Sequence, residues 1–418
     1  MARIVLATFG SHGDVFPYIA IAVRLKERGH DPVMAGPAVY RADVEAHGLT
    51  FAALRPAVDL QDPELYRRAM DPKRGTVFVV RELLVPCIRE SYADIERVCE
   101  GADLLVSHAL TYAAHMLGER GSIPWISTAL MPMMFFSAHD PPALSPIPWL
   151  ARTRILGPGV VGLLRRLIRR AGWSWGEPIR EFRRELGLNA KLDPLWDGQF
   201  SPDGVLALFS SSFASAQPDW PPATTICGFP FHDHDFGGDA DASRLDAFLE
   251  AGPPPLVFSL GSSAARAAGD FYDTAAAAAQ QLGRRAVLVT GSVAVSGELP
   301  SDVLAIRSSS LHRLFEAASV VIHAGGIGST GLALMVGCPQ LVVPFAHDQF
   351  DNAIRVVRHG VGRSLHRRRL TVRRLTRNVA HILGDAEMRS RATVLGERVR
   401  GEDGPGAACD VIEQILGT

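Results

Sequence analysis

The sequence predicts an α/β protein made of two doubly wound halves, on the strength of three observations. Short apolar runs of strand length alternate with amphipathic helical patterns, which is typical of βαβ units and a parallel sheet. The same alternation restarts near residue 255, after a stretch with little periodicity. The chain is 418 residues long, beyond the size at which one hydrophobic core keeps growing, so we expect two domains.

In the first half, buried strands are predicted at residues 3–9, 31–36, 102–108 and 124–130. Amphipathic helices are predicted at residues 17–30 and 111–121, the first of them closed by Gly29. Because each strand is followed by a helix, these elements are expected to build a parallel sheet.

In the second half, strands are predicted at residues 255–262, 285–291, 304–310, 319–326 and 339–345. Helices are predicted at residues 271–283, 311–318 and 331–337. A Pro-, Gly- and Asp-rich stretch separates the two halves and suits an interdomain linker. We therefore predict an N-terminal domain over residues 1–222, a linker over 223–245, a C-terminal domain over 246–395, and a C-terminal helix over 396–418 that packs back on the first domain.

Composition excludes several classes of protein. The formal net charge of −1 gives no general basic field to attract nucleic acid, so no nucleic-acid partner is expected. None of the five cysteines stands in a CxxC pair or in a set with zinc-ligand spacing, which favours reduced thiols and no metal site. The first residues lack a signal-peptide pattern, and no apolar run approaches the ~20 residues needed to span a bilayer. A cytoplasmic location is predicted.

The segment 323–331, HAGGIGSTG, stands where a strand turns into a helix. Glycines let a ligand approach the backbone, and the amides at a helix start attract anions. Ser329 and Thr330 add hydroxyl donors, and His323 can donate to a phosphate oxygen. The turn matches neither a P-loop nor GxGxxG, so a diphosphate cradle and simple close packing both remain interpretations of it.

About twenty residues further on, the segment 344–353, PFAHDQFDNA, gathers acidic and amide side chains. Asp348, Gln349, Asp351 and Asn352 can cap a helix. They can equally accept and donate hydrogen bonds to several hydroxyls of a sugar.

The glycine turn, followed by Gly-Cys-Pro and His-Asp-Gln-x-x-Asn-Ala, resembles the donor signature of nucleotide-sugar glycosyltransferases with two facing Rossmann-like domains, the GT-B type. Plant and animal UDP-glycosyltransferases, antibiotic glycosyltransferases and sterol glucosyltransferases belong to that superfamily. FGSHGDVFPYIAIAVRLKERGH resembles its N-terminal acceptor-domain motif, QPDWP…CGFP its linker, and LVFSLGSS its first C-terminal strand. Within the superfamily, GDVFP, GDFY, HxGGIG and AHDQFDNA are most similar to bacterial rhamnosyltransferases of rhamnolipid synthesis.

This resemblance implies two facing domains with a cleft between them, and an inverting transfer that needs neither metal nor cofactor. A hexose of rhamnose or glucose type would pass from a UDP- or dTDP-sugar to a hydroxyl of a small hydrophobic acceptor. The N-terminal domain would bind the acceptor and the C-terminal domain the nucleotide sugar. Asp14 stands where antibiotic and sterol relatives have their general base. His12 is the alternative base, and His108 could orient whichever group acts.

The resemblance also assigns the binding residues. The donor diphosphate would meet His323, Gly325, Gly326, Gly328, Ser329, Thr330, Gly261 and Ser262. The donor sugar would meet Asp348 and Gln349. The nucleobase would rest on Ser308, Ser309, Ser310 and Leu311, where plant relatives have Trp-x-Pro-Gln, so the choice between UDP and dTDP stays open. The acceptor would contact an apolar wall that includes Met131, Met134, Phe135 and Phe136.

Further interpretations are kept or rejected on the residues. A dehydrogenase is rejected, because the first turn is GSHGD and the second strand ends in AGP without a carboxylate. A non-catalytic nucleotide-sugar-binding protein remains an alternative, as does a partner-dependent subunit that docks through the arginine-rich segment 366–377. The helical pattern around residues 160–171 predicts either a solvated surface helix or a transient contact with an anionic membrane surface.

Overall fold

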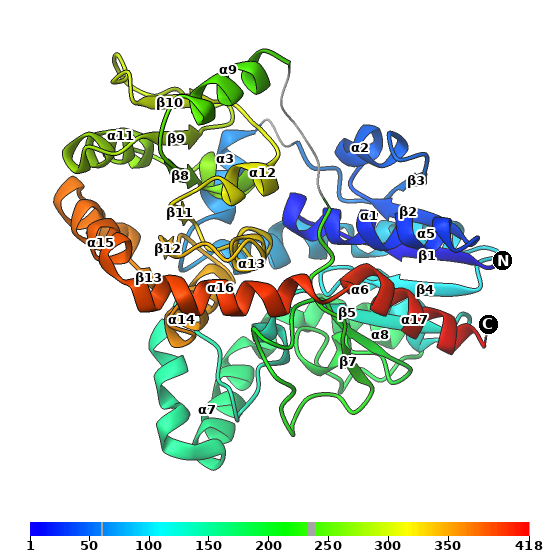
Figure 1. Cartoon of the computed structure of the whole chain (residues 1–418). Coiled ribbons are helices and arrows are strands. Elements are labelled where there is room, and N and C mark those ends of the chain that lie inside the picture. The colour runs from blue at the N-terminus through cyan, green and yellow to red at the C-terminus, as the bar shows by residue number, and fades with distance from the viewer. Residues whose placement is uncertain (60–61, 233–238, 418) are drawn as a thin grey trace.

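A computed structural model describes residues 1–59, 62–232 and 239–417 (Figure 1). It confirms the predicted fold class, because two parallel sheets of seven and six strands form the two halves of the molecule. The sequence prediction differs from the structure at the linker. Thr224–Ile226 lies inside the predicted linker and forms a strand of the first sheet, whereas residues 233–238 fall outside the described part of the chain.

The first sheet has the strand order β3-β2-β1-β4-β5-β6-β7. Its strands are β1 (Arg3–Ala7), β2 (Asp31–Gly36), β3 (Thr50–Ala53), β4 (Leu104–Ser107), β5 (Trp125–Ala129), β6 (Val205–Ala207) and β7 (Thr224–Ile226). The second sheet has the order β10-β9-β8-β11-β12-β13. Its strands are β8 (Leu256–Ser259), β9 (Ala286–Val289), β10 (Val303–Ile306), β11 (Val320–His323), β12 (Gln340–Val342) and β13 (Gly362–Ser364).

Helices cover both sheets (Figure 1). In chain order they are α1 (His12–Glu27), α2 (Arg41–Glu45), α3 (Pro63–Ala69), α4 (Gly75–Phe78), α5 (Ile88–Val98), α6 (Tyr112–Glu119), α7 (Gly157–Gly172), α8 (Glu177–Glu185), α9 (Asp239–Glu250), α10 (Gly261–Ala265), α11 (Phe271–Leu282), α12 (Leu311–Glu316), α13 (Ile327–Met335), α14 (Gln349–Arg358), α15 (Val372–Gly384), α16 (Ala386–Arg400) and α17 (Gly404–Leu416). None of the described helices is long and apolar enough to cross a membrane.

The continuous apolar runs of the strands are explained by burial on both faces. In β1, Ile4 and Leu6 join one hydrophobic cluster, while Val5 and Ala7 join another on the opposite face. In β8, Leu256 and Phe258 are likewise separated from Val257. A parallel sheet covered by helices on both sides selects such runs rather than alternation of polar and apolar residues.

Each sheet reverses its strand order at one place, and these two places position the candidate site. In the first sheet the reversal lies between β1 and β4, and in the second it lies between β8 and β11. The loops at the carboxyl ends of strands flanking such a reversal form a crevice where open α/β sheets bind ligands. The loops after β1 and β8 and the glycine turn after β11 therefore stand at the binding edges.

Several contacts hold the two halves together across the space between them. The Arg355 guanidinium on α14 pairs with Asp140 of the first half at 2.6 Å and with Asp351 of its own helix at 2.7 Å. The Arg266 guanidinium lies 4.6 Å from the centre of the Tyr66 ring of α3. At the chain end, α17 packs against α1, so that Cys409 and Ile412 enter the core of the first half.

Candidate functional site

A large cavity of about 1390 Å³ lies between the two halves and is lined by loops from both of them. Its walls include the loops after β1 and β4 in the first sheet, and those after β8, β10 and β11 in the second. Both strand-order reversals thus open onto the same space. The size matches that of a cleft for two substrates held side by side.

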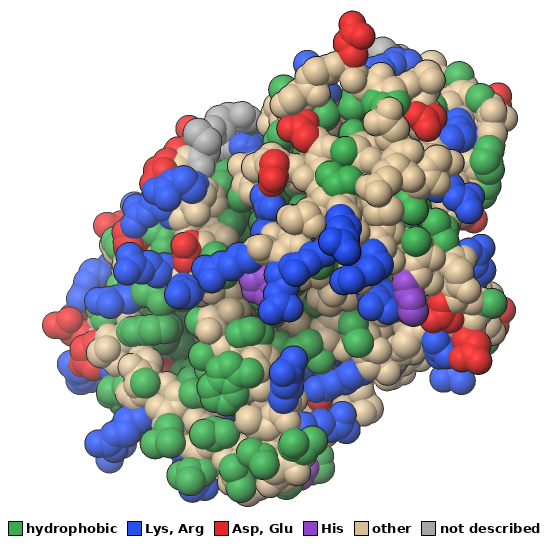
Figure 2. All heavy atoms as spheres, turned by 90° about the vertical axis from the view of Figure 1, so that its left-hand side faces the viewer, with side chains coloured by type: hydrophobic (Ala, Val, Ile, Leu, Met, Phe, Trp, Pro, Cys, Tyr) green, Lys and Arg blue, Asp and Glu red, His purple; other side chains and the backbone are tan. Residues whose placement is uncertain are grey.

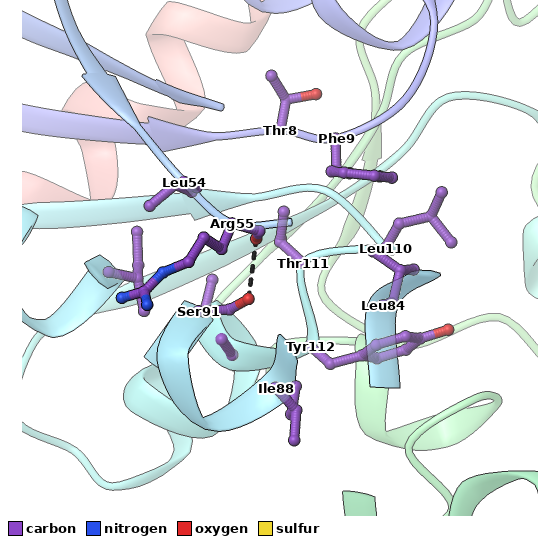
Figure 3. A pocket seen from close by; sticks show the side chains of 13 residues that line it. Thr8, Phe9, Leu54, Arg55, Leu84, Ile88, Ser91, Leu110, Thr111 and Tyr112 are labelled. Atoms are coloured by element: carbon purple, nitrogen blue, oxygen red, sulfur yellow. Dashed lines mark hydrogen bonds between the residues drawn. The ribbon is translucent and has the colours of Figure 1, made fainter. Parts of the chain in front are cut away.

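A second, small cavity lies behind the first strand-order reversal (Figure 3). Phe9, Leu84 and Leu110 are among the residues that line it, and beside it the Ser91 hydroxyl donates to the Arg55 carbonyl. Its volume of about 30 Å³ is room for one or two water molecules. It cannot hold a sugar, so the candidate site is the large cavity.

Asp14 lies in the first turn of α1 and lines the large cavity. Its Oδ2 atom accepts hydrogen bonds from the Ser11 backbone N–H at 2.7 Å and from the Ser11 hydroxyl at 2.9 Å. A side chain on Gly10 would have its Cβ 2.3 Å from the same oxygen, so glycine leaves the room that the carboxylate occupies. One oxygen of Asp14 thus accepts the hydrogen bonds at the start of α1, and the other oxygen is left to act in the cavity.

The second Asp14 oxygen faces His108, at the end of β4. Oδ1 lies 3.7 Å from Nε2 of His108, and Nδ1 of His108 accepts the Leu110 backbone N–H at 3.2 Å. Burial lowers the His108 pKa to about 3, so the imidazole is neutral and its proton sits on Nε2, toward the carboxylate. Burial also raises the Asp14 pKa, which makes this carboxylate a better proton acceptor.

His12 is the first residue of α1 and also lines the cavity. Its ring stacks on Phe16 with centroids 4.9 Å apart and meets the Tyr40 ring edge-on at 5.6 Å. The imidazole therefore forms part of an aromatic wall. Asp14, and not His12, makes the close approach to His108.

The glycine turn after β11 has an open side and a buried side. Gly326, Gly328 and Ser329 line the cavity, together with Ile327. A Cβ placed on Gly326 or Gly328 would meet no atom within 4 Å, which describes an empty cradle over the start of α13. First-turn amides such as those of Gly328 and Ser329 have no acceptor within the helix, so this side can bind an anion.

The buried side differs from the sequence prediction. His323 is fully buried: its Nε2 bonds to Gln340 Oε1 at 2.9 Å, and its Nδ1 accepts the Gly325 N–H at 3.0 Å. Burial lowers its pKa to about 4, so the ring is neutral. Gly325 and Thr330 also lie outside the cavity lining, and Gly325 has φ +95° with its missing Cβ 2.5 Å from Val342 Cγ1. These three residues lie behind the turn, outside the cavity lining, and their contact with a diphosphate stays a prediction.

Asp348 stands at the cavity edge of the same turn. Its Oδ2 accepts the Ile327 backbone N–H at 3.1 Å and the Asn352 amide at 2.7 Å. Burial, with a further contribution from the Asp14 charge across the cavity, raises the Asp348 pKa to about 7. Asp14 and Asp348 thus line the same cavity from the two halves of the molecule.

Gln349 lines the cavity, but its Oε1 accepts the backbone N–H groups of Phe345 and Ala346 at 2.8 and 3.1 Å. Sequence reasoning missed the neighbouring His347, for which the central position in AHDQ was the available signal; in the structure its φ is +53°. Its Nδ1 lies 3.2 Å from the Thr76 hydroxyl of the first half, and its ring lines the cavity. His347 therefore joins the two walls beside Asp14 and Asp348.

The segment expected to carry a nucleobase is only partly exposed to the cavity. Ser308, Ser309 and Leu311 line it, and so do Arg307 and His312, which the sequence analysis did not single out. Ser310 instead caps α12, where its hydroxyl accepts the Arg313 N–H at 3.4 Å. Gly261 and Ser262, the first residues of α10, also line the cavity.

The apolar wall expected to hold an acceptor is also divided. Met131, Met134 and Phe136 line the cavity. Phe135 points the other way, stacks on Trp220 with centroids 4.0 Å apart, and belongs to a hydrophobic cluster shared by both halves. The structure thus corrects the expectation for Phe135, which packs in the core.

The arrangement can take a proton on Asp14 while the glycine turn receives negative charge on the opposite wall. A displacement between two substrates held in one cavity needs these two functions. Within the described ranges, no three His, Cys, Asp or Glu side chains gather in a way that could hold a metal ion.

The two halves of the chain match two different family models. Residues 4–134 match the glycosyltransferase family 28 N-terminal domain. Residues 284–414 match the C-terminal domain of erythromycin biosynthesis protein CIII-like proteins.

Curated relatives match almost the whole chain. An O-mycaminosyltylonolide 6-deoxyallosyltransferase of Streptomyces fradiae is 33% identical, over 99% of this chain and 97% of the relative. A sterol 3-beta-glucosyltransferase of Leptosphaeria maculans is 28% identical over 99% of this chain. The chain spans about three-tenths of the length of the sterol glucosyltransferases that it matches.

Solved structures share the fold along the full chain. A spinosyn rhamnosyltransferase superposes with a TM-score of 0.70 at 20% identity, covering 100% of both chains. The same enzyme has been solved with thymidine diphosphate and with spinosyn aglycone. A calicheamicin glycosyltransferase superposes with a TM-score of 0.67 at 18% identity, covering 100% of this chain and 98% of its own.

Proposed function

We propose that this chain, which belongs to the superfamily of antibiotic and sterol glycosyltransferases with the GT-B fold, catalyses an inverting and metal-independent hexosyl transfer. Its family makes it a nucleotide-sugar-dependent glycosyltransferase. The donor is a UDP- or dTDP-hexose. The acceptor is a hydroxyl of a natural-product aglycone, a sterol or a similar hydrophobic molecule.

One observation carries the proposal: Asp14 and the open side of the glycine turn face the same cavity from opposite halves. The acceptor hydroxyl loses its proton to Asp14 as its oxygen attacks the anomeric carbon. The bond between that carbon and the diphosphate oxygen breaks from the opposite face. The amides at the start of α13 stabilise the charge that appears on the leaving diphosphate.

His108 positions the base without exchanging a proton itself. A neutral imidazole whose Nε2–H points toward Oδ1, 3.7 Å away, favours the negative charge of the carboxylate. This gives Asp14 precedence over His12 as the base. His12 instead contributes to the wall on which an acceptor ring could rest.

The acceptor class follows from the apolar part of the cavity. Met131, Met134 and Phe136 offer adaptable contacts to a flat or branched apolar body. The named relatives act, by their names, on O-mycaminosyltylonolide and on sterols, and they support an acceptor that is a natural-product aglycone or a sterol. The rhamnolipid-type acceptor that the sequence motifs favour stays a prediction to be tested beside these.

The proposal is tested by incubating the purified chain with UDP- and dTDP-hexoses and a mixed panel of sterols, macrolide aglycones and hydroxy fatty acid esters. Mass spectrometry identifies the product, and the anomeric coupling in its NMR spectrum reports inversion. Titration calorimetry with UDP and dTDP identifies the nucleotide independently of turnover. Failure to bind either nucleotide would contradict the proposal. Binding without turnover until a second protein is added would favour the partner-dependent alternative.

A further inference from the structure

Helix α7 buries Val161 against the protein but also presents an apolar side to solvent, which an ordinary surface helix does not. Leu163 and Leu167 lie one turn apart on this side, and each is 55% exposed. Arg165 and Arg169 point toward the protein body, where they pair with Asp219 at 3.2 Å and with Asp197 at 2.7 Å. Because two arginines of the helix form ion pairs with the protein body while the leucines stay exposed, the outer face of α7 is suited to contact an apolar phase.

The exposed apolar side chains extend beyond the helix. A 3-10 helix, Pro148–Leu156, precedes α7, and its Ile155 is 90% exposed. We call the whole group the α7 patch, whose largest members are Trp149, Ile155, Leu156, Leu163, Leu167 and Trp173. Exposed apolar groups of this size mark interaction sites. Tryptophan at its edges is typical of proteins that contact the membrane–water interface.

The charge around the α7 patch has one sign. Between Asp140 and Glu177 the sequence has six arginines and no acidic residue. Arg152, Arg154, Arg166 and Arg170 are exposed and form no ion pair within the described ranges. An apolar stripe flanked by cations is the pattern of a helix that lies in the plane of an anionic membrane.

The second half adds cations on the same side of the molecule. Residues 363–377 carry seven arginines, and no acidic residue occurs between Asp351 and Asp385. This segment leads into α15, which lies on the same side of Figure 1 as α7. Seen from that side, Figure 2 shows a band of basic side chains across the middle of the face and hydrophobic side chains gathered below it.

We propose that the α7 patch docks on an anionic phospholipid membrane, with its apolar side chains entering the interface and the arginines of both halves contacting lipid phosphates. A second copy of the chain fits the face poorly, because symmetric pairing would bring the two arginine-rich segments together. A membrane supplies both an apolar interior and negative charge, and so complements both properties of the face.

The α7 helix also connects this face with the cavity. Ile168, Ala171 and Gly172 line the large cavity near the end of the helix, and Trp175 follows them. A hydrophobic acceptor dissolved in the membrane would therefore reach the Met131 and Phe136 wall without crossing water. The docking itself does not depend on sugar transfer, so it can be tested even if the proposed function fails.

The test is flotation of the full chain with vesicles of phosphatidylcholine alone and of phosphatidylcholine mixed with phosphatidylglycerol. The wild-type chain is expected to float with the mixed vesicles, to stay below with the neutral ones, and to lose binding as salt is raised. Replacing Leu163 and Leu167 together by Gln is expected to weaken binding at least about tenfold, because two apolar side chains no longer enter the interface. Replacing Arg166 and Arg170 together by Gln is expected to weaken binding to mixed vesicles and to reduce its salt dependence.

Matched controls come from the opposite side of the molecule. Val39→Gln changes another exposed apolar side chain, and Arg41→Gln with Arg97→Gln removes two exposed cations near α2 and α5. These variants should float like wild type. Equal flotation of the leucine variant and the wild type would overturn the proposal. A dimer in sedimentation velocity that the leucine substitutions abolish would also overturn it, by assigning the α7 patch to self-association.

Discussion

The two strand-order reversals occupy the same place in their sheets, yet they present different chemistry to the cavity. The first offers a carboxylate backed by a neutral imidazole, Asp14 and His108. The second offers a bare backbone cradle at Gly326 and Gly328, with Asp348 at its edge. Topology therefore fixes where ligands bind. The residues in each loop then decide the chemistry: the loop in one half accepts a proton, and the loop in the other binds a phosphate.

The largest expected effect is the loss of turnover when Asp14 is replaced, and it distinguishes the role of the first wall from that of the second. Asp14→Asn keeps the hydrogen bond to Ser11 but removes the proton acceptor, so kcat should fall by about 10²–10⁴. Nucleotide affinity should change less than about twofold, because the cradle belongs to the other half. Steady-state kinetics and titration calorimetry on the same preparation measure both. His12→Asn is the matched control and should lose much less turnover. Equal losses in the two variants would move the base to His12 or to a shared role.

The two sides of the glycine turn should respond oppositely to an added methyl group. Gly326→Ala and Gly328→Ala place a Cβ in open space, so the unfolding free energy should change by less than about 1 kcal/mol. The same methyl group intrudes on a bound diphosphate and should weaken nucleotide binding about tenfold or more.

Gly325→Ala provides the contrast within the same turn. Its φ of +95° and the contact with Val342 should lower the unfolding free energy by about 1–3 kcal/mol. Urea denaturation and calorimetry distinguish the two patterns. If the Gly328→Ala variant binds nucleotide as tightly as the wild type, the glycine turn does not bind the diphosphate.

The Asp348 carboxyl should make stability depend on pH. Its pKa of about 7 in the folded protein lies above the ordinary value of 3.8. The protonated carboxyl therefore contributes to the unfolding free energy in full below about pH 4, and this contribution is lost as pH rises toward 7. Asp348→Asn removes this decrease in stability with pH, because the amide does not ionise. Relative to wild type, the variant should gain about 1–3 kcal/mol of unfolding free energy between about pH 5 and pH 8. Urea denaturation at both pH values measures the difference. A constant difference across pH would show that Asp348 ionises normally.

The smallest expected effect is that of a chelator. Because backbone amides receive the leaving charge in the proposed mechanism, EDTA should leave the transfer rate unchanged within about twofold. Rates measured with EDTA and then with added Mg²⁺ provide the check. A rate that collapses with EDTA and returns with Mg²⁺ would show that the cradle alone is insufficient.

Much of the fold was accessible from sequence, because buried parallel strands and amphipathic helices leave strong periodic patterns. The loops that hold Asp14, Gly261 and the glycine turn were found for the same reason, since each follows a recognisable strand. The boundary of the first sheet was missed at β7, whose three residues are half-exposed and lie among prolines and glycines.

The direction of individual side chains within a loop could not be predicted. His323 turns to Gln340, which enters from the next strand and has no local signature. Phe135 and Phe136 are adjacent and both apolar, but only tertiary packing decides that the first stacks on Trp220 and the second lines the cavity. His347 was overlooked because its partner, Thr76, lies 271 residues away in the chain.

A crystal structure of the chain with UDP or dTDP bound would show directly whether the glycine turn receives the diphosphate. We expect the diphosphate at the start of α13, with phosphate oxygens within hydrogen-bonding distance of the Gly328 and Ser329 amides, and the nucleobase near Arg307 and Leu311. A diphosphate held in another part of the cavity, away from that helix start, would contradict it.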